Sequence, residues 1–248
     1  MTTPRRLIAG NWKMHGLAAA LAEARAVAAA VDEQSPAARV ALCPPATLIH
    51  RMAELLGGSG VEVGGQDCRA EPQGAFTGCL SAEMLADAGA RLVILGHSEC
   101  RELHRETSAE VAAKVAAALR AGLEPIVCVG EGADDHAAGR TLEVVLGQVA
   151  QSLPEALRGH AFSVAYEPIW AIGSGHTPSL DEIEAVHAAI RSALVERWAK
   201  DGDAPILYGG SVNGGNAAEI LAVPDVGGAL VGGASLTANQ FLPIVRAA

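Results

Sequence analysis

The sequence predicts an α/β protein whose eight parallel strands close into a (β/α)8 barrel, and three observations lead to this prediction. Short, almost purely apolar runs recur along the 248 residues at roughly thirty-residue spacing, as expected of strands that are covered on both faces. Alanine-rich amphipathic segments separate these runs, so that strand and helix alternate. The glycine-rich turns come late in the chain, which distinguishes this fold from its main alternative.

That alternative is a doubly wound open sheet, and the first turn argues against it. A dinucleotide-binding sheet carries its glycine fingerprint at the first strand–helix turn, where this chain reads GNWKMHG (residues 10–16). The glycine-rich turns instead follow the seventh and eighth runs, at 208–216 and 230–236. Barrels often bind phosphate at those two turns, so the barrel is favoured.

The expected elements follow one another without a linker. The helix expected over 107–122 opens with the capping residue Thr107 and closes with Gly122, and further helices are expected over 17–31 and 180–200. Because no Ser-, Gly- or Pro-rich stretch divides the chain, residues 1–248 are expected to form one domain. The segments that contain the expected strands are 6–12, 39–45, 61–67, 91–99, 124–132, 162–168, 205–211 and 228–234.

Composition restricts the possible partners and compartment. Half of the residues are hydrophobic and 19% are charged, which allows a sizeable core. The formal net charge of −10, without a Lys/Arg cluster to override it, argues against nucleic acid and anionic membranes as partners. The five cysteines form no C-x-x-C pair and read as reduced thiols. With no signal peptide and no apolar run of about 18 residues, we expect a soluble cytoplasmic protein.

Chemically useful residues gather where the predicted strands end, and in such barrels this face carries the active site. The set combines acids, an imidazole, a cation and glycines that can approach an anion. Its members are Asn11, Lys13, Gln66, Asp67, His97, Glu99, Glu131, Glu167, Ser211, Gly232 and Gly233.

Two neighbouring turns, YGGSVNGGN (208–216) and LVGGASL (230–236), predict a phosphate site. Glycine lets the backbone approach a ligand closely, and a helix N-terminus presents free N–H groups to an anion. One such turn alone is more often a feature of backbone geometry than a binding site. Both together, on the last two units of a barrel, make phosphate binding the better interpretation.

An acid, an imidazole and a lysine on the same face predict proton abstraction beside a carbonyl group. Lys is usually a solvated surface residue and a lone His is usually structural, but Lys13, His97 and Glu167 all follow strands. The positive end of a helix favours a neutral imidazole at His97. His97 fits neither H-E-x-x-H nor a Cys/His cage, and no serine stands in a nucleophile elbow, so neither a metal nor a nucleophile is expected. These groups suit a small phosphorylated substrate that reacts through an enediolate, without a cofactor.

The chain resembles the triosephosphate isomerase family from end to end. The motifs are GNWKM (10–14), GAFTG (74–78), ILGHSE (94–99), AYEPIWAIGSG (165–175), YGGSVN (208–213) and LVGGASL (230–236), in the family's order and spacing. The resemblance implies the TIM-barrel fold, interconversion of dihydroxyacetone phosphate and glyceraldehyde 3-phosphate, and a homodimer.

The same resemblance implies a role for individual residues. Glu167 would be the general base, His97 the neutral electrophile and Lys13 the group that stabilises negative charge, with Asn11 and Glu99 in support. Residues 171–175 would form a lid over the phosphate. The phosphate would be held by Asn11, Lys13, Gly173, Ser211, Gly232 and Gly233, and Thr77 would reach into the partner's site.

Several positions depart from the family pattern. His15 replaces a frequent Asn, Cys79 replaces a common Glu near the expected dimer contact, and Cys100 replaces a common Arg beside Glu99. These departures leave open a relative that isomerises a four-carbon ketose phosphate. A non-catalytic phosphosugar-binding protein is a further alternative, although binding alone does not require Glu167.

Overall fold

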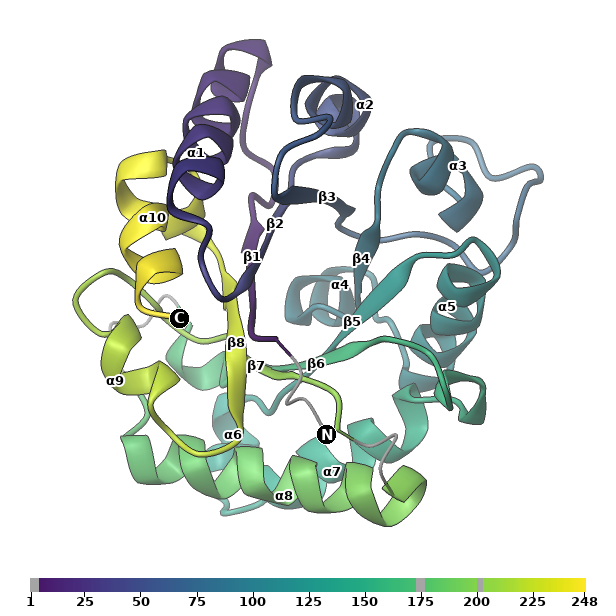
Figure 1. Ribbon diagram of the computed structural model, residues 1–248. Helices are drawn as coiled ribbons and strands as arrows, with labels where there is room; N and C mark the ends of the chain where they lie inside the picture. The colour runs from purple at the N-terminus through teal and green to yellow at the C-terminus, as the bar shows by residue number, and fades with distance from the viewer. Residues whose placement is uncertain (1–4, 173–176, 200–202) are drawn as a thin grey trace.

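The predicted barrel is confirmed. The computed structural model describes residues 5–172, 177–199 and 203–248. Within them, eight parallel strands close in chain order, each pairing with its neighbours and β8 pairing back to β1 (Figure 1). The strands are β1 Leu7–Asn11, β2 Arg39–Cys43, β3 Val61–Gly65, β4 Leu92–Leu95, β5 Glu124–Val129, β6 Ser163–Tyr166, β7 Ile206–Tyr208 and β8 Val226–Val231.

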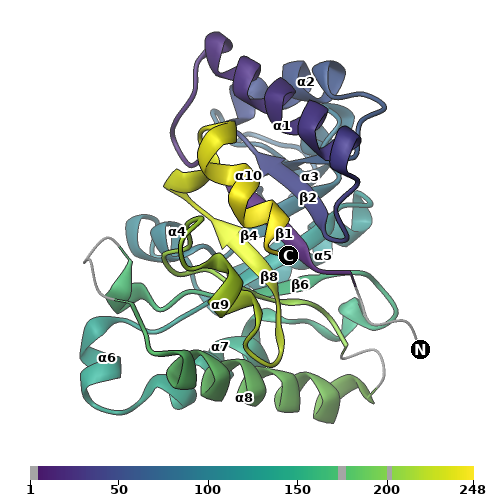
Figure 2. The same ribbon diagram turned by 60° about the vertical axis from the view of Figure 1, so that its left-hand side comes forward.

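Helices surround the barrel, as two views related by a 60° turn show (Figures 1 and 2). Their longest member, α8, begins with a capping box between Ser179 and Glu182, and α5 begins with the predicted cap at Thr107. The α-helices are α1 Leu21–Gln34, α2 Ala46–Leu55, α3 Ala82–Asp87, α4 Ser98–Leu103, α5 Ser108–Arg120, α6 Ala133–Ala137, α7 Thr141–Ser152, α8 Leu180–Trp198, α9 Ala217–Leu221 and α10 Ala238–Arg246. Short 3₁₀ turns are η1 Ala18–Ala20, η2 Glu155–Leu157, η3 Ile169–Ala171 and η5 Gly233–Ser235.

Two elements differ in detail from the prediction. The helix expected over 17–31 begins with the 3₁₀ turn η1, and the α-helix itself starts only at Leu21. The phosphate-type turn after β8 leads into the single 3₁₀ turn η5 before α10 begins at Ala238. In the described structure η5 follows β8 within two residues, which keeps the backbone of Gly233 at the mouth of the barrel.

Alternation along the strands separates two cores. Residues that face the barrel axis form one buried cluster, whereas their neighbours pack against the helices. Cys43 and Cys128 belong to the inner cluster, and burial raises the pKa of Cys43 to about 12, so both thiols serve as apolar filling. The inner cluster is Leu7, Ala9, Ala41, Cys43, Leu92, Ile94, Ile126, Cys128, Ala165, Leu207 and Leu230.

The same alternation determines which residues point into the mouth of the barrel. Ala9, Ala165 and Leu230 face inward near the carboxyl ends of β1, β6 and β8. The residues two positions further along are Asn11, Glu167 and Gly232, and each lines the cavity described below. Period two therefore continues past the strands and places these predicted residues on one face.

An ion cluster lies at the opposite, amino-terminal end of the strands. Arg39 at the start of β2 pairs with Glu62 of β3 and with Glu124 at the start of β5, using both oxygens of each carboxylate at 2.8–3.0 Å. The two carboxylates raise the pKa of Arg39 further above its usual range. This end of the barrel carries structural ion pairs.

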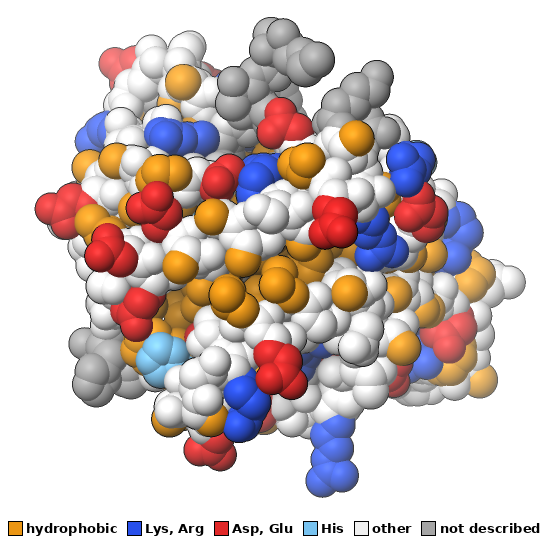
Figure 3. Space-filling view, turned by 90° about the horizontal axis from the view of Figure 1, so that it is seen from below, with side chains coloured by type: hydrophobic (Ala, Val, Ile, Leu, Met, Phe, Trp, Pro, Cys, Tyr) orange, Lys and Arg blue, Asp and Glu red, His pale blue; other side chains and the backbone are white. Residues whose placement is uncertain are grey.

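The side of the molecule formed by α6, α7 and α8 shows acidic and basic side chains interspersed around a band of apolar ones (Figure 3). No concentration of Lys and Arg is visible on this face, in agreement with the acidic composition. In the part of the chain that the structure describes, no helix is long and apolar enough to cross a membrane.

Candidate active site

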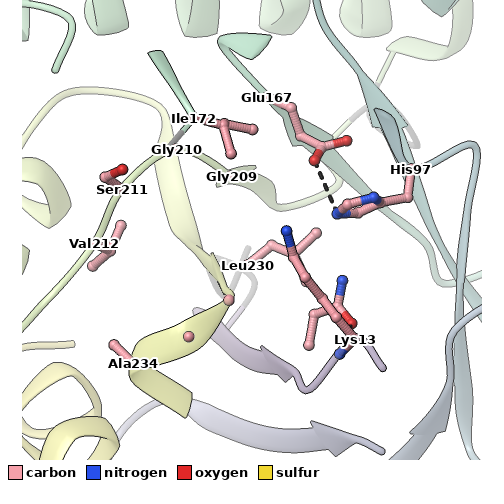
Figure 4. A pocket seen from close by; sticks show the side chains of 13 residues that line it. Lys13, His97, Glu167, Ile172, Gly209, Gly210, Ser211, Val212, Leu230 and Ala234 are labelled. Atoms are coloured by element: carbon pink, nitrogen blue, oxygen red, sulfur yellow. Dashed lines mark hydrogen bonds and ion pairs between the residues drawn. The ribbon is translucent and has the colours of Figure 1, made fainter. Parts of the chain in front are cut away.

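A cavity of about 270 Å³ opens at the carboxyl ends of the strands. It brings together residues at, or just after, the carboxyl ends of β1, β4, β6, β7 and β8, as the sequence predicts (Figure 4). Its lining residues are Asn11, Lys13, His97, Glu167, Ile172, Gly209, Gly210, Ser211, Val212, Leu230, Gly232, Gly233 and Ala234.

A strained turn positions His97 at the end of β4. Gly96 adopts φ +68°, and a Cβ there would lie 2.9 Å from Cγ2 of Val111, so glycine meets both a conformational and a steric requirement. Arg101 fastens the turn by donating Nε to the Gly96 carbonyl at 2.8 Å and Nη2 to the Cys128 carbonyl at 3.1 Å. His97 is then the N-cap of α4, as expected from its place after the strand.

The hydrogen bonds of His97 assign its tautomer. Its Nδ1 accepts the backbone N–H of Glu99 at 3.2 Å, so the lone pair is on Nδ1 and the proton is on Nε2. Nε2 lies 3.1 Å from Oε1 of Glu167, and this contact is the dashed line in Figure 4. The side chains of His97 and Glu167 are 8% and 2% exposed, so the pair is almost shielded from water. A neutral imidazole thus presents a proton donor to a buried carboxylate.

Glu167 is also held by Ser98, which the sequence analysis did not assign to the site. The Ser98 backbone N–H donates to Oε2 at 2.9 Å and its hydroxyl donates to Oε1 at 3.0 Å. Both carboxylate oxygens are therefore satisfied within the protein. Because Ser98 follows His97 directly, its closeness to Glu167 could be expected only once the two strand ends were known to meet.

Lys13 enters the cavity from the loop after β1. Its φ of 51° is rarely adopted by non-glycine residues, and its backbone N–H donates to Oδ1 of Asn11 at 3.0 Å. The amide of Gln66 supports the turn by donating to the carbonyl of Lys13 at 2.9 Å. Figure 4 shows the ammonium group pointing toward His97 and Glu167. A conformation that costs about 1 kcal/mol is thus held in place to direct one cation into the site.

Glu99 lies outside the cavity lining and contacts both predicted catalytic neighbours. Its Oε1 accepts from Nζ of Lys13 at 2.7 Å, and its Oε2 lies 3.8 Å from Nδ1 of His97. Partial burial acts to raise the pKa of Glu99, but the hydrogen bond and charge of Lys13 outweigh burial and hold this pKa below its usual range. The carboxylate therefore serves to orient Lys13 in the absence of an anion.

Backbone N–H groups form the opposite side of the cavity. Ser211 follows β7 and Gly233 begins η5, and among the described residues neither backbone N–H has a hydrogen-bond acceptor. A Cβ on Gly232 would lie 3.6 Å from Cε of Lys13, so this turn runs along the lysine stem. Two N–H groups near a cation provide the kind of environment that binds phosphate. The predicted contribution of Gly173 lies outside the described residues.

A second buried carboxylate, Glu131, fixes the chain on both sides of Glu167. Its Oε1 accepts from the hydroxyl of Tyr166 at 3.1 Å and from Nε1 of Trp170 at 2.8 Å. Burial and the neighbouring Glu131 raise the pKa of Tyr166, which keeps the hydroxyl protonated as a donor. The residue before Glu167 and the residue three after it are thereby held by one fully buried group.

Comparison with known proteins identifies the family. A family model described as triosephosphate isomerase matches residues 6–248. The triosephosphate isomerase of Caulobacter vibrioides is 61% identical over 247 residues, which cover 99% of this chain and 98% of that protein. The chain belongs to the triosephosphate isomerase family. The triosephosphate isomerase of Hyphomonas neptunium is 55% identical over 99% of both chains. The crystal structure of triosephosphate isomerase from Bartonella henselae matches with a TM-score of 0.92 at 42% identity, covering 98% of this chain and 99% of that one.

The predicted family, barrel fold and isomerase class are therefore confirmed. Of the predicted site residues, Asn11, Lys13, His97, Glu167, Ser211, Gly232 and Gly233 line one cavity. Glu99 touches two of them from outside, and Thr77 lies exposed on the segment between β3 and α3, away from the lining. Sequence reasoning did not single out Ile172, Gly209, Gly210, Val212, Leu230 and Ala234 as lining residues, although all six belong to the quoted family motifs.

Proposed function

We propose that this protein interconverts dihydroxyacetone phosphate and glyceraldehyde 3-phosphate through an enediolate, with Glu167 as the base and His97 as a neutral proton donor. The observation that carries the proposal is the pairing of a buried carboxylate with an imidazole whose donor nitrogen faces it at 3.1 Å. This pairing occurs in a cavity that also contains a cation and backbone N–H groups with no acceptor in the part of the chain that the structure describes. Membership in the triosephosphate isomerase family supports it.

The reaction divides between the two groups. Glu167 takes the proton from the carbon next to the carbonyl group, and the electron pair moves into the new carbon–carbon double bond. Negative charge then develops on the carbonyl oxygen, where the Nε2–H of His97 and the ammonium of Lys13 stabilise it. Through Nε2, His97 then gives its proton to the former carbonyl oxygen and takes up the proton of the neighbouring hydroxyl group, so that the second oxygen becomes the new carbonyl oxygen. Glu167 returns its proton to the former carbonyl carbon, which completes the isomerisation without a cofactor and restores both groups to their starting state.

The carboxylate must change partners before it can act. Both of its oxygens accept hydrogen bonds from Ser98, and Oε1 also faces Nε2 of His97. A substrate carbonyl that accepts a hydrogen bond from Nε2 of His97 replaces the contact between His97 and Oε1 of Glu167. Glu167 then has to leave Ser98 to reach carbon, so the arrangement described here is a resting one.

The phosphate is assigned to the side of the cavity formed by Ser211, Gly232 and Gly233, with Lys13 and Asn11 between phosphate and carbonyl. Gly173 is proposed as a further contact on the basis of the family motif alone. Placing the anion at backbone N–H groups leaves the side chains of His97 and Glu167 free for the reacting carbons.

The deciding experiment compares substrates and removes the base. We expect a coupled assay to show isomerisation of triose phosphate, and Glu167→Gln to lower kcat by about a thousandfold or more because the amide cannot accept the proton. Binding of a phosphorylated inhibitor, measured by calorimetry, should remain within a few-fold of the wild-type protein. Preference for a four-carbon ketose phosphate would favour the alternative substrate, and unchanged turnover in Glu167→Gln would refute the assigned base.

We further propose that residues 1–248 form a single domain that acts as a homodimer in the cytoplasm, without nucleic acid or membrane partners. Exposed apolar side chains support the dimer, since Met14 and Leu17 are 94% and 82% exposed and Phe76, the residue before Thr77, is also exposed. Light scattering at micromolar concentration should give the mass of two chains. A monomeric mass at full activity would overturn the dimer and the proposed role of Thr77.

A further inference from the structure

His136 lies outside the cavity, on the short helix α6, and lies flat against Trp170. The ring centroids of His136 and Trp170 are 3.9 Å apart and the rings are within 14° of parallel. The His136 side chain is 34% exposed, so it can exchange protons with solvent. Trp170 in η3 comes three residues after Glu167 and two before Ile172, which lines the cavity. The stack therefore contacts the segment that directly follows the proposed base.

His136 is also the ion-pair partner of Glu131. The Glu131 side chain is fully buried, and its Oε2 has no hydrogen-bond partner among the described residues. The group near it that can carry a positive charge is the imidazole of His136, whose Nδ1 lies 3.8 Å from Oε1 of Glu131. A buried carboxylate without a cation is unfavourable, so a charge on His136 would compensate it directly.

The two contacts act on the same indole. Glu131 accepts the Nε1–H of Trp170, and an imidazolium above the indole face gains a cation–π interaction as well as attraction to Glu131. The Glu131 backbone carbonyl also accepts the N–H of Ile169 at 3.2 Å. Protonation of His136 thus fixes Ile169 and Trp170, which follow Glu167 in the chain, more firmly in place.

The other charged groups around His136 do not supply a positive charge to Glu131 in its place. Asp134 and Asp135 are on its own helix, and Asp135 is engaged by Arg140 at 2.6 Å. From α7, the Thr141 hydroxyl lies 3.5 Å from Nδ1 and donates to Oε1 of Glu131 at 3.3 Å, while Glu143 is exposed in the same first turn. From the start of α8, Glu182 lies within electrostatic range of His136. These surroundings are acidic overall.

We propose that His136 is a pH-dependent positioning residue: in its charged form it holds Trp170 and the segment 166–172 in the resting arrangement, where Glu167 is bonded to Ser98, and so lowers turnover. The proposal rests on the proposed function, because the segment matters through Glu167. Histidine is the side chain that most often changes charge near neutral pH, so pH is the variable of both tests.

The first test measures tryptophan fluorescence of the free protein, which reports the contact between His136 and Trp170. An imidazolium in contact with an indole quenches its fluorescence, so we expect the emission of the wild-type protein to fall on titration from pH 8 to pH 5. His136→Gln and His136→Phe should lose this transition, and Trp170→Phe should lose it too, since Trp12 and Trp198 are elsewhere. His160→Gln, which changes another exposed histidine, should keep it. A transition that survives in His136→Gln and His136→Phe overturns the proposal.

The second test reads turnover. Between pH 7.5 and pH 5.5 the kcat of the wild-type protein should fall about two- to fivefold more than that of His136→Phe, which keeps a stacked ring without a charge. His136→Arg introduces a permanent cation, so its kcat should be lower than that of His136→Phe at both pH values. Its KM should be unchanged, because the proposed phosphate contacts follow other strands. Superimposable pH profiles of kcat would refute the proposal, since a purely structural role would lower activity equally at all pH values. If the wild-type protein does not isomerise triose phosphate, the proposed function fails, and fluorescence alone then decides whether His136 holds Trp170.

Discussion

Gly130 allows a sharp test of how closely Glu167, the proposed base, is positioned. It follows β5, and a Cβ built on it would lie 1.9 Å from the backbone carbonyl oxygen of Glu167. The residue cannot withdraw easily, because Gln148 holds it from the other side. The Gln148 side chain accepts the Gly130 N–H at 2.8 Å and donates to its carbonyl at 2.9 Å.

The size of the disturbance follows from these distances. Ordinary contact of a Cβ begins at 3.4 Å, so Gly130→Ala requires a displacement of 3.4 − 1.9 = 1.5 Å between the two backbones. Because the obstructing atom belongs to the backbone of Glu167, a large share of this shift is transmitted to the carboxylate. A misplacement of about 1 Å costs roughly a hundredfold in rate, and overpacking costs about 1–3 kcal/mol of stability.

The assay compares Gly130→Ala with Gly132→Ala. At Gly132, two residues further along the same loop, an added Cβ meets nothing within 4 Å, which makes it a matched control. We expect kcat/KM to fall about a hundredfold in Gly130→Ala and to change less than about threefold in Gly132→Ala. Equal activity and equal unfolding midpoints in the two variants would show that the position of Glu167 does not depend on this contact.

Three further predictions test charge. Arg39→Met should lower the free energy of unfolding in urea by about 1–3 kcal/mol, because Glu62 and Glu124 lose their shared cation at a partly exposed site. Burial lowers the pKa of His187 from 6.5 to about 4, so between these pH values the unfolded chain binds a proton that the folded chain does not, and stability falls as pH falls. This 2.5-unit difference is worth about 3 kcal/mol, and His187→Phe should lose correspondingly less stability over that window in the same unfolding assay. Lys13→Met should reduce kcat/KM about a hundredfold or more in the isomerase assay, and a smaller loss would leave the stabilising role to other groups.

Most of the fold could be predicted because its determinants are local. Apolar runs without polar alternation identified the strands, and a capping residue and a terminal glycine identified α5. Period two along β1, β6 and β8 then places Asn11, Glu167 and Gly232 inside the mouth. The start of α1 was less accurate, because alanine-rich sequence is compatible with either a 3₁₀ or an α turn.

The parts of the site that escaped prediction depend on contacts between distant segments. Ser98 is 69 positions from Glu167 in the sequence, and its role exists only because β4 and β6 end at the same height. The stack of His136 on Trp170 likewise joins α6 to η3, and no periodic pattern in the sequence predicts this contact. In the sequence His136 reads as one of several scattered histidines. Contacts of this kind require the register and closure of the barrel, which no single segment encodes.

The acidic composition and an anionic substrate are compatible because the relevant forces act over different ranges. At physiological ionic strength charges on the surface are screened beyond about 8 Å, so the net charge of −10 acts mainly on large charged partners that touch much of the surface. Within the cavity, Lys13 and the N–H groups of Ser211 and Gly233 lie in the lining itself, where screening is weak. Glu99 already holds the Lys13 ammonium at 2.7 Å, so an arriving substrate finds it oriented and does not bear the full cost of immobilising a flexible side chain. The carboxylate that weakens the local positive charge therefore also orients the cation for its proposed role, and we expect the preference of this acidic protein for a small anion to follow from that short-range arrangement.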